Sequence, residues 1–97
     1  MKMIRAHLIV EGRVQGVYYR ANTADTANKH DVCGWVKNYT DGTVEAMLEG
    51  EAESVERVIA WCRVGPPRAR VDTVKVEYLD YSGEFDGFSA ITSYNTY

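Results

Sequence analysis

No apolar run in this chain is long enough to cross a membrane, because the stretch from Leu8 to Val10 is interrupted at once by Glu11 and a spanning helix needs about 20 apolar residues. The chain also lacks a basic excess, since 11 lysines and arginines face 14 aspartates and glutamates. Nucleic-acid-binding proteins usually carry a clear positive charge. We therefore expect no membrane partner and no nucleic-acid partner.

Cysteine and histidine are also scarce. Cys33 and Cys62 follow neither metal-ligand spacing nor a disulfide framework, and His7 and His30 have no pattern of carboxylates or cysteines around them that would complete a metal site. The N-terminus has no apolar signal-peptide segment, so we expect a cytoplasmic protein whose two thiols stay reduced. We expect no metal and no other cofactor.

Ninety-seven residues make a single domain, residues 1–97, with one core. Alternating apolar residues predict strands at about 6–14, 33–39, 43–49, 74–78 and 87–92. Small residues at every third position predict a helix over 19–29, with the left-handed C-terminal residue at Asp31. A second helix has apolar residues from Val55 to Cys62 and ends before Gly65-Pro66-Pro67.

This order of elements, βαββαβ with a short fifth strand, is that of an α+β ferredoxin-like sandwich. In such a fold two helices cover one face of an antiparallel sheet. The third strand would then lie between the first and second, with the axes of those two strands about 10 Å apart. Arg20 and Asn38 should therefore converge at one edge of the sheet.

The segment from Gly12 to Arg20 ends an apolar strand in a glycine-containing loop and brings an arginine to the start of a helix. Backbone amides in such a loop and the positive end of a helix both attract an oxyanion, and a guanidinium offers paired donors to two phosphate oxygens. This pattern predicts a phosphate-binding site. Its backbone donors would be the amides of Gln15, Gly16, Val17, Tyr18, Tyr19 and Arg20.

A second motif, Gly34-Trp35-Val36-Lys37-Asn38, follows the first and precedes Gly42, Val44 and Gly50. Together with Gly65-Pro66-Pro67, Ala69, Val71, Phe88 and Ile91, these two motifs strongly resemble the acylphosphatase family over nearly the whole chain. The resemblance implies a hydrolase that splits the carboxyl-phosphate anhydride of a small acyl phosphate into a carboxylate and inorganic phosphate. The product phosphate would compete for the same site.

The chemistry of the two motifs agrees with the resemblance. An acyl phosphate releases a carboxylate whose conjugate acid has a pKa of about 4, so its departure needs no general acid at neutral pH. What the protein has to supply is the positioning of the reactants and the stabilisation of charge. The resemblance implies that Arg20 binds the phosphate while Asn38 orients the attacking water. A neutral amide suits the second role, because a carboxylate there would repel the substrate.

The sequence also leads to expectations for several aromatic residues. Trp35, Trp61 and Phe88 are expected to be packing residues. Tyr18 stands where the family often has a small residue, so it is expected to reshape the mouth of the site and alter the preference for the acyl group.

Two other functions fit the same fold. RNA-recognition domains share this order of elements, but the third strand, Thr43 to Glu49, lacks their stacking aromatics. A noncatalytic anion-binding domain would not require Asn38 beside Arg20. The family's fold also opens larger carbamoyl-transferring maturation proteins, whose further domains this chain is too short to hold. We therefore expect a monomeric, metal-independent enzyme.

Overall fold

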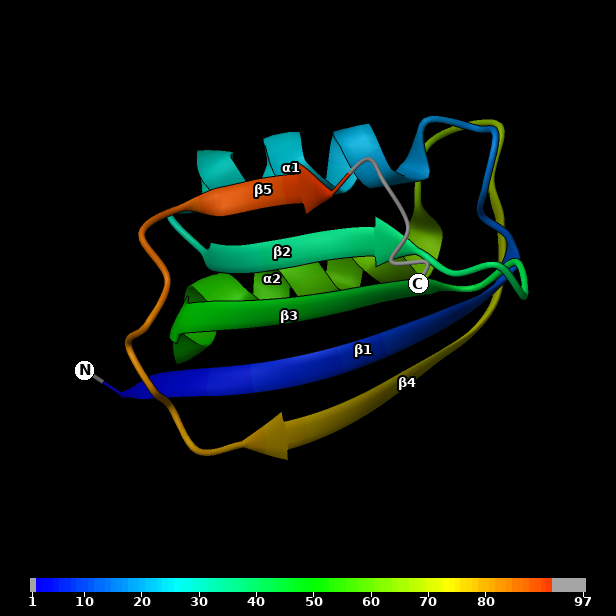
Figure 1. Ribbon diagram of the computed structural model, residues 1–97. Helices are drawn as coiled ribbons and strands as arrows, with labels where there is room; N and C mark the ends of the chain where they lie inside the picture. Colours follow the sequence, from blue (N-terminus) through cyan, green and yellow to red (C-terminus); the bar gives the residue numbers. More distant parts are fainter. Residues whose placement is uncertain (1, 92–97) are drawn as a thin grey trace.

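The computed structural model describes residues 2–91 and contains every predicted helix and strand (Figure 1). In chain order they are β1 (Met3–Arg13), α1 (Tyr19–Lys29), β2 (Cys33–Asn38), β3 (Val44–Glu51), α2 (Ala52–Val64), β4 (Arg70–Leu79) and β5 (Phe88–Ile91). The predicted end of the fifth strand at Thr92 lies outside the described residues. Neither helix in residues 2–91 is long and apolar enough to span a membrane.

The strands form one sheet in the order β4-β1-β3-β2-β5, and both helices cover the same face of it (Figure 1). The α+β ferredoxin-like fold is confirmed, with β3 antiparallel to both β1 and β2. β5, however, pairs parallel to β2. The periodicity of the sequence did not predict this, because the pairing depends on how the segment 80–87 carries the chain from one edge of the sheet to the other (Figure 1).

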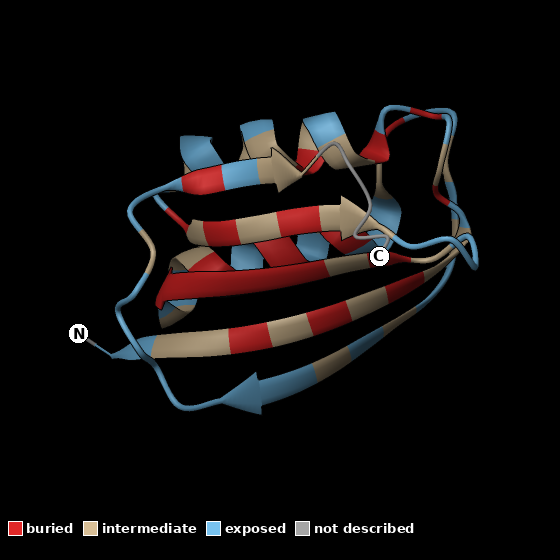
Figure 2. Cartoon of the chain, viewed as in Figure 1, coloured by how far each residue is buried: buried red, intermediate tan, exposed pale blue. Residues whose placement is uncertain are grey.

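The core lies between the sheet and the two helices. The inward residues of β1, namely Ala6, Leu8 and Val10, are fully buried against α2 residues such as Val55 and Val58 (Figure 2). Burying a large aliphatic side chain of this kind stabilises the fold by about 1.5–3 kcal/mol. The core therefore holds the end of β1, and the loop that follows it, against the start of α1.

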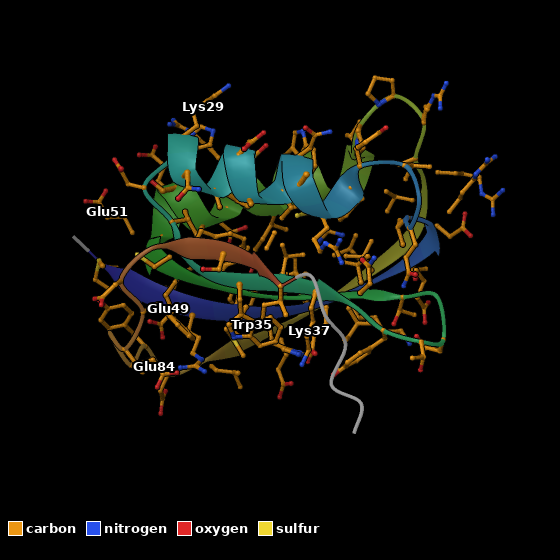
Figure 3. All side chains as sticks on the ribbon, turned by 45° about the horizontal axis from the view of Figure 1, so that its top comes forward. Lys29, Trp35, Lys37, Glu49, Glu51 and Glu84 are labelled. Atoms are coloured by element: carbon orange, nitrogen blue, oxygen red, sulfur yellow. The ribbon has the colours of Figure 1, made fainter. Side chains whose placement is uncertain are left out.

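The predicted packing residues divide between the two faces of the sheet. Trp61 and Phe88 pack into the core as expected. Trp35 instead lies half-buried on the face away from the helices, with the Lys37 ammonium 5.0 Å from its ring centroid (Figure 3). Strand alternation places both residues on that face, because Val36 between them is buried in the core.

Glu49 is the buried carboxylate of this uncovered face, with only 1 % of its surface exposed. It accepts hydrogen bonds from the backbone amides of Ser82 and Gly83, at 2.8 and 3.1 Å, and from Arg5 at 3.2 Å. Burial alone would raise the pKa of Glu49, but these hydrogen bonds and the Arg5 charge outweigh it and hold the pKa below its usual value. Glu49 therefore fastens the segment 80–87, and with it the approach to β5.

We expect Glu49→Gln to lower the free energy of unfolding at pH 7 by about 1–3 kcal/mol, since charged hydrogen bonds to a buried group are lost. A lowered folded-state pKa stabilises the protein above the pKa of the unfolded chain, and this stabilisation is lost as the pH falls through the folded value. The difference between parent and variant should therefore shrink below about pH 4.5. Denaturant unfolding of both proteins from pH 7 to 3, with the exposed Glu77→Gln as control, measures this difference. A constant difference at every pH would contradict the role of the Glu49 charge.

Candidate active site

The loop between β1 and α1 meets the end of β2 at a pocket of about 400 Å³. Arg20 lies in the first turn of α1 and Asn38 is the last residue of β2. Both line this pocket, so the predicted convergence of Arg20 and Asn38 is confirmed. The full lining consists of Val14, Gln15, Gly16, Tyr18, Tyr19, Arg20, Ala21, Asn38 and Ala90.

Helix α1 begins without a cap. No side chain bonds to its first turn, and that turn contains no acidic residue. Its first backbone hydrogen bond runs from the Asn22 amide to the Tyr18 carbonyl at 3.1 Å, so the amides of Tyr19, Arg20 and Ala21 have no partner inside the helix. Exposed amides at the positive end of a helix dipole form a site for an anion.

The loop before the helix has the backbone that such a site needs. Gly16 has φ 75°, a left-handed conformation that glycine adopts at no steric cost. A Cβ at Gly16 would meet no atom within 4 Å, so its backbone conformation, rather than lack of space, calls for glycine there. Tyr18 is also left-handed, with φ 66°, which is uncommon for a residue with a side chain. No pattern in the sequence predicted the left-handed conformation of Tyr18.

The charge of the pocket is positive although the chain is acidic. Among the described residues that line the pocket, Arg20 carries a charge and none is a carboxylate. Within residues 2–91, the Arg20 guanidinium makes neither an ion pair nor a side-chain hydrogen bond, whereas Arg5 and Arg70 both pair with carboxylates. The Arg20 charge is therefore available to a ligand in the pocket.

Asn38, which lines the same pocket, has an unsatisfied acceptor. Its Oδ1 atom is buried and has no hydrogen-bond partner among the described residues. Leaving such a group unsatisfied costs about 1–3 kcal/mol. A donor that enters the pocket beside Asn38, such as a water molecule, would remove that cost.

The Gln15 side chain joins the two halves of the site. Its Nε2 donates to the carbonyls of Tyr39 and Thr43, at 2.7 and 2.8 Å. These residues follow Asn38 in the turn between β2 and β3, which Asp41 closes by accepting from the Thr43 amide and hydroxyl. From the sequence, only the backbone amide of Gln15 was predicted to belong to the site. The contacts of its side chain were not predicted, because a sequence does not show which distant carbonyls an amide side chain reaches.

The buried side chain of Tyr19 anchors the loop to α2. It is almost fully buried, and its hydroxyl donates to the Cys62 carbonyl at 2.7 Å. Burial raises the pKa of Tyr19, so the hydroxyl remains a donor. A Cβ at Gly65, whose φ is 74°, would lie 3.0 Å from the Tyr19 ring, so glycine is required for this close approach.

Burial also raises the pKa of the Cys62 thiol to about 12, which makes it a poor nucleophile.

The remaining predicted residue, Val17, has its side chain buried in the core at 4 % exposure. Three further residues line the pocket without having been predicted from the sequence: Val14, Ala21 and Ala90. Val14 and Ala21 flank the predicted loop, but Ala90 reaches the pocket only through the parallel pairing of β5 with β2. Among the described residues, no three histidines, cysteines or carboxylates come together as metal ligands.

The chain is therefore a small α+β protein, a ferredoxin-like sandwich in which one pocket brings together an uncapped helix start, an arginine unpaired within residues 2–91 and an asparagine with a buried amide oxygen. Residues 6–90 match the model of the family described as Acylphosphatase. The chain belongs to the acylphosphatase family.

Individual relatives cover almost the whole chain. An acylphosphatase of Natronomonas pharaonis is 58 % identical over 85 residues, which are 88 % of this chain and 91 % of the relative. One of Pelotomaculum thermopropionicum is 53 % identical over 88 residues, 91 % and 96 % of the two chains. The crystal structure of acylphosphatase from Bacillus subtilis has a TM-score of 0.88 and 31 % identity, and covers 92 % of this chain and 99 % of that one.

The activity of the chain is that of its family. It is a hydrolase that acts on small-molecule acyl phosphates and splits the carboxyl-phosphate anhydride bond.

Proposed function

We propose that the phosphoryl group of the substrate binds in the 400 Å³ pocket, held by the Arg20 guanidinium and the backbone amides from Gln15 to Arg20. One observation carries this proposal: Asn38, whose buried Oδ1 has no partner among the described residues, lines the same pocket as Arg20 and the uncapped start of α1. Donors on three sides of a phosphoryl group stabilise the charge on its equatorial oxygens. We refer to Arg20 and these loop amides as the cradle.

Asn38 orients the nucleophile in this proposal. Its free carbonyl oxygen accepts a hydrogen bond from a water molecule, whose oxygen then attacks phosphorus in line with the leaving carboxylate. The bond between phosphorus and the acyl oxygen breaks, and the carboxylate departs with the electron pair. It needs no proton, because its conjugate acid has a pKa of about 4.

The proton of the attacking water goes to a phosphoryl oxygen. No histidine or carboxylate is among the described residues that line the pocket, so this part of the chain provides no general base there. Because the Asn38 side chain is neutral, it does not repel the negatively charged phosphate. Inorganic phosphate, the second product, would occupy the same cradle and inhibit competitively.

The setting of the enzyme is also part of the proposal. A monomer that works in the cytoplasm, without metal, nucleic acid or membrane, agrees with the acidic balance of the chain and with its two free cysteines. The uncovered face of the sheet carries paired charges, including Arg5 with Glu49 and Lys37 with Glu45, rather than a basic patch. Such a face offers little to a nucleic-acid backbone.

Turnover assays test the proposed function. With a chelator present and spontaneous hydrolysis subtracted, acetyl phosphate should be hydrolysed, and inorganic phosphate should inhibit. Methyl phosphate should be a poor substrate, because its alkoxide leaving group needs a proton that no lining residue is placed to donate. Loss of activity in chelator with recovery on adding a divalent metal would contradict the proposal, as would comparable turnover of methyl phosphate.

A further inference from the structure

A second hollow of about 380 Å³ opens beside the cradle pocket and shares Tyr18 and Ala21 with it. It runs between the start of α1 and the turn after α2, and we refer to it as the proline groove. Its lining residues are Val17, Tyr18, Ala21, Asn22, Pro66, Pro67 and Arg68.

The proline groove is apolar and rigid. Tyr18 is 73 % exposed and has a left-handed backbone, a conformation that is uncommon for a residue with a side chain. In the turn after α2, the Ala69 amide donates to the Pro66 carbonyl at 3.0 Å and closes a tight turn, in which the ring of Pro67 fixes its φ. The exposed Tyr18 and Pro67 line the groove together with the buried Pro66 and form a preformed apolar surface.

The position of the proline groove fits one part of the substrate. In-line attack requires the water and the leaving group on opposite sides of phosphorus. Asn38, which holds the water in the proposed mechanism, lines the cradle pocket but not the proline groove. An acyl group leaving the cradle away from Asn38 would therefore enter the space between Tyr18 and Pro67.

We propose that the proline groove is the acyl-binding subsite and that it favours acyl phosphates with an aromatic or bulky apolar acyl group. This inference rests on the proposed cradle, because the phosphoryl position directs the acyl group into the groove. Tyr18 and Pro67 are the specificity-determining residues, and the exposed Arg68 adds a planar group that stacks on an aromatic acyl ring. An acyl group with a second negative charge would instead form an ion pair with Arg68. The experiment distinguishes an aromatic acyl group from an anionic one.

The experiment compares kcat/KM for benzoyl phosphate with kcat/KM for acetyl phosphate in each protein. We expect Tyr18→Gly and Pro67→Ser to lower this benzoyl-to-acetyl ratio about threefold to tenfold, mainly through a higher KM for benzoyl phosphate. Tyr18→Gly suits the left-handed backbone, and Pro67→Ser suits a turn position that accepts most residues, so both should fold. Tyr18→Phe, which keeps the ring, should retain the ratio.

Tyr81→Ala is the matched control. Tyr81 is an exposed tyrosine in the segment 80–87, which joins β4 to β5 at the opposite end of the sheet from the β1–α1 loop (Figure 1). It should leave both the ratio and the acetyl phosphate activity unchanged.

An unchanged ratio in either folded variant would overturn the proposed subsite. So would an Arg68→Ala protein in which turnover of succinyl phosphate falls while that of benzoyl phosphate does not. In both cases inorganic phosphate would still inhibit the parent, and Arg20→Lys would still remove that inhibition. Survival of phosphate inhibition in Arg20→Lys would instead indicate that the cradle itself is wrongly assigned.

Discussion

Arg20→Lys is expected to lower kcat/KM for acyl phosphates about 10²–10³-fold, the loss typical of removing a donor that stabilises transition-state charge. Lysine keeps the positive charge but cannot place two parallel hydrogen bonds on a phosphoryl group. Because Arg20 makes no ion pair within residues 2–91, the loss would come from the ligand rather than from a broken structural contact. Steady-state kinetics and competitive inhibition by inorganic phosphate measure both effects.

Arg57→Lys is the matched control for this substitution. Arg57 lies on α2, where it pairs with Glu53 at 3.6 Å and remains largely exposed. An exposed pair of this kind contributes little to stability, so the control should keep parental kinetics. Parental turnover and phosphate inhibition in Arg20→Lys would remove Arg20 from the site.

Asn38→Ala is expected to lower kcat about 10²-fold or more, because the attacking water loses its anchor. The cradle stays in place, so the inhibition constant of inorganic phosphate should change less than about threefold, a difference of about 0.7 kcal/mol. The substitution also removes the buried acceptor that has no partner among the described residues, so the free energy of unfolding should fall by no more than about 1 kcal/mol. A large catalytic loss without a stability loss separates a positioned water from a packing defect.

Two further variants test the role of Asn38, one at the same position and one as a control. Asn38→Asp keeps the shape of the side chain but adds a negative charge beside the phosphate, so it should weaken phosphate inhibition as well as kcat. Asn28→Ala, at an exposed position on α1, is the matched control and should behave as the parent. A folded Asn38→Ala protein with kcat within about threefold of the parent would assign the water to another group.

Local signals predicted most of the fold and part of the site. The alternation along β1 and the small residues at every third position of α1 are set by neighbours in sequence, and both elements lie where predicted. The left-handed residue at Asp31, with φ 58°, was likewise predicted from its place after a helix. The convergence of Arg20 and Asn38 followed from topology, since β3 between β1 and β2 brings the two strand ends to one edge.

The features that the sequence did not predict depend on contacts between distant segments. Gln15 reaches carbonyls 24 and 28 positions away, and Glu49 binds amides more than 30 positions further along the chain. The left-handed Tyr18 opposes the ordinary preference of a tyrosine, so only the packing around the loop decides it. The proline groove joins the start of α1 to a turn beyond α2, and no local pattern connects the two.

Titration of isotope-labelled protein with inorganic phosphate, followed through its backbone amide resonances, tests the central claim most directly. The cradle predicts that the largest shifts fall on the amides from Gln15 to Arg20, with a dissociation constant equal to the inhibition constant for acyl phosphate hydrolysis. Arg20→Lys should abolish these shifts, and Asn38→Ala should keep them. Shifts concentrated outside this loop, or inhibition without any shift in it, would contradict the account.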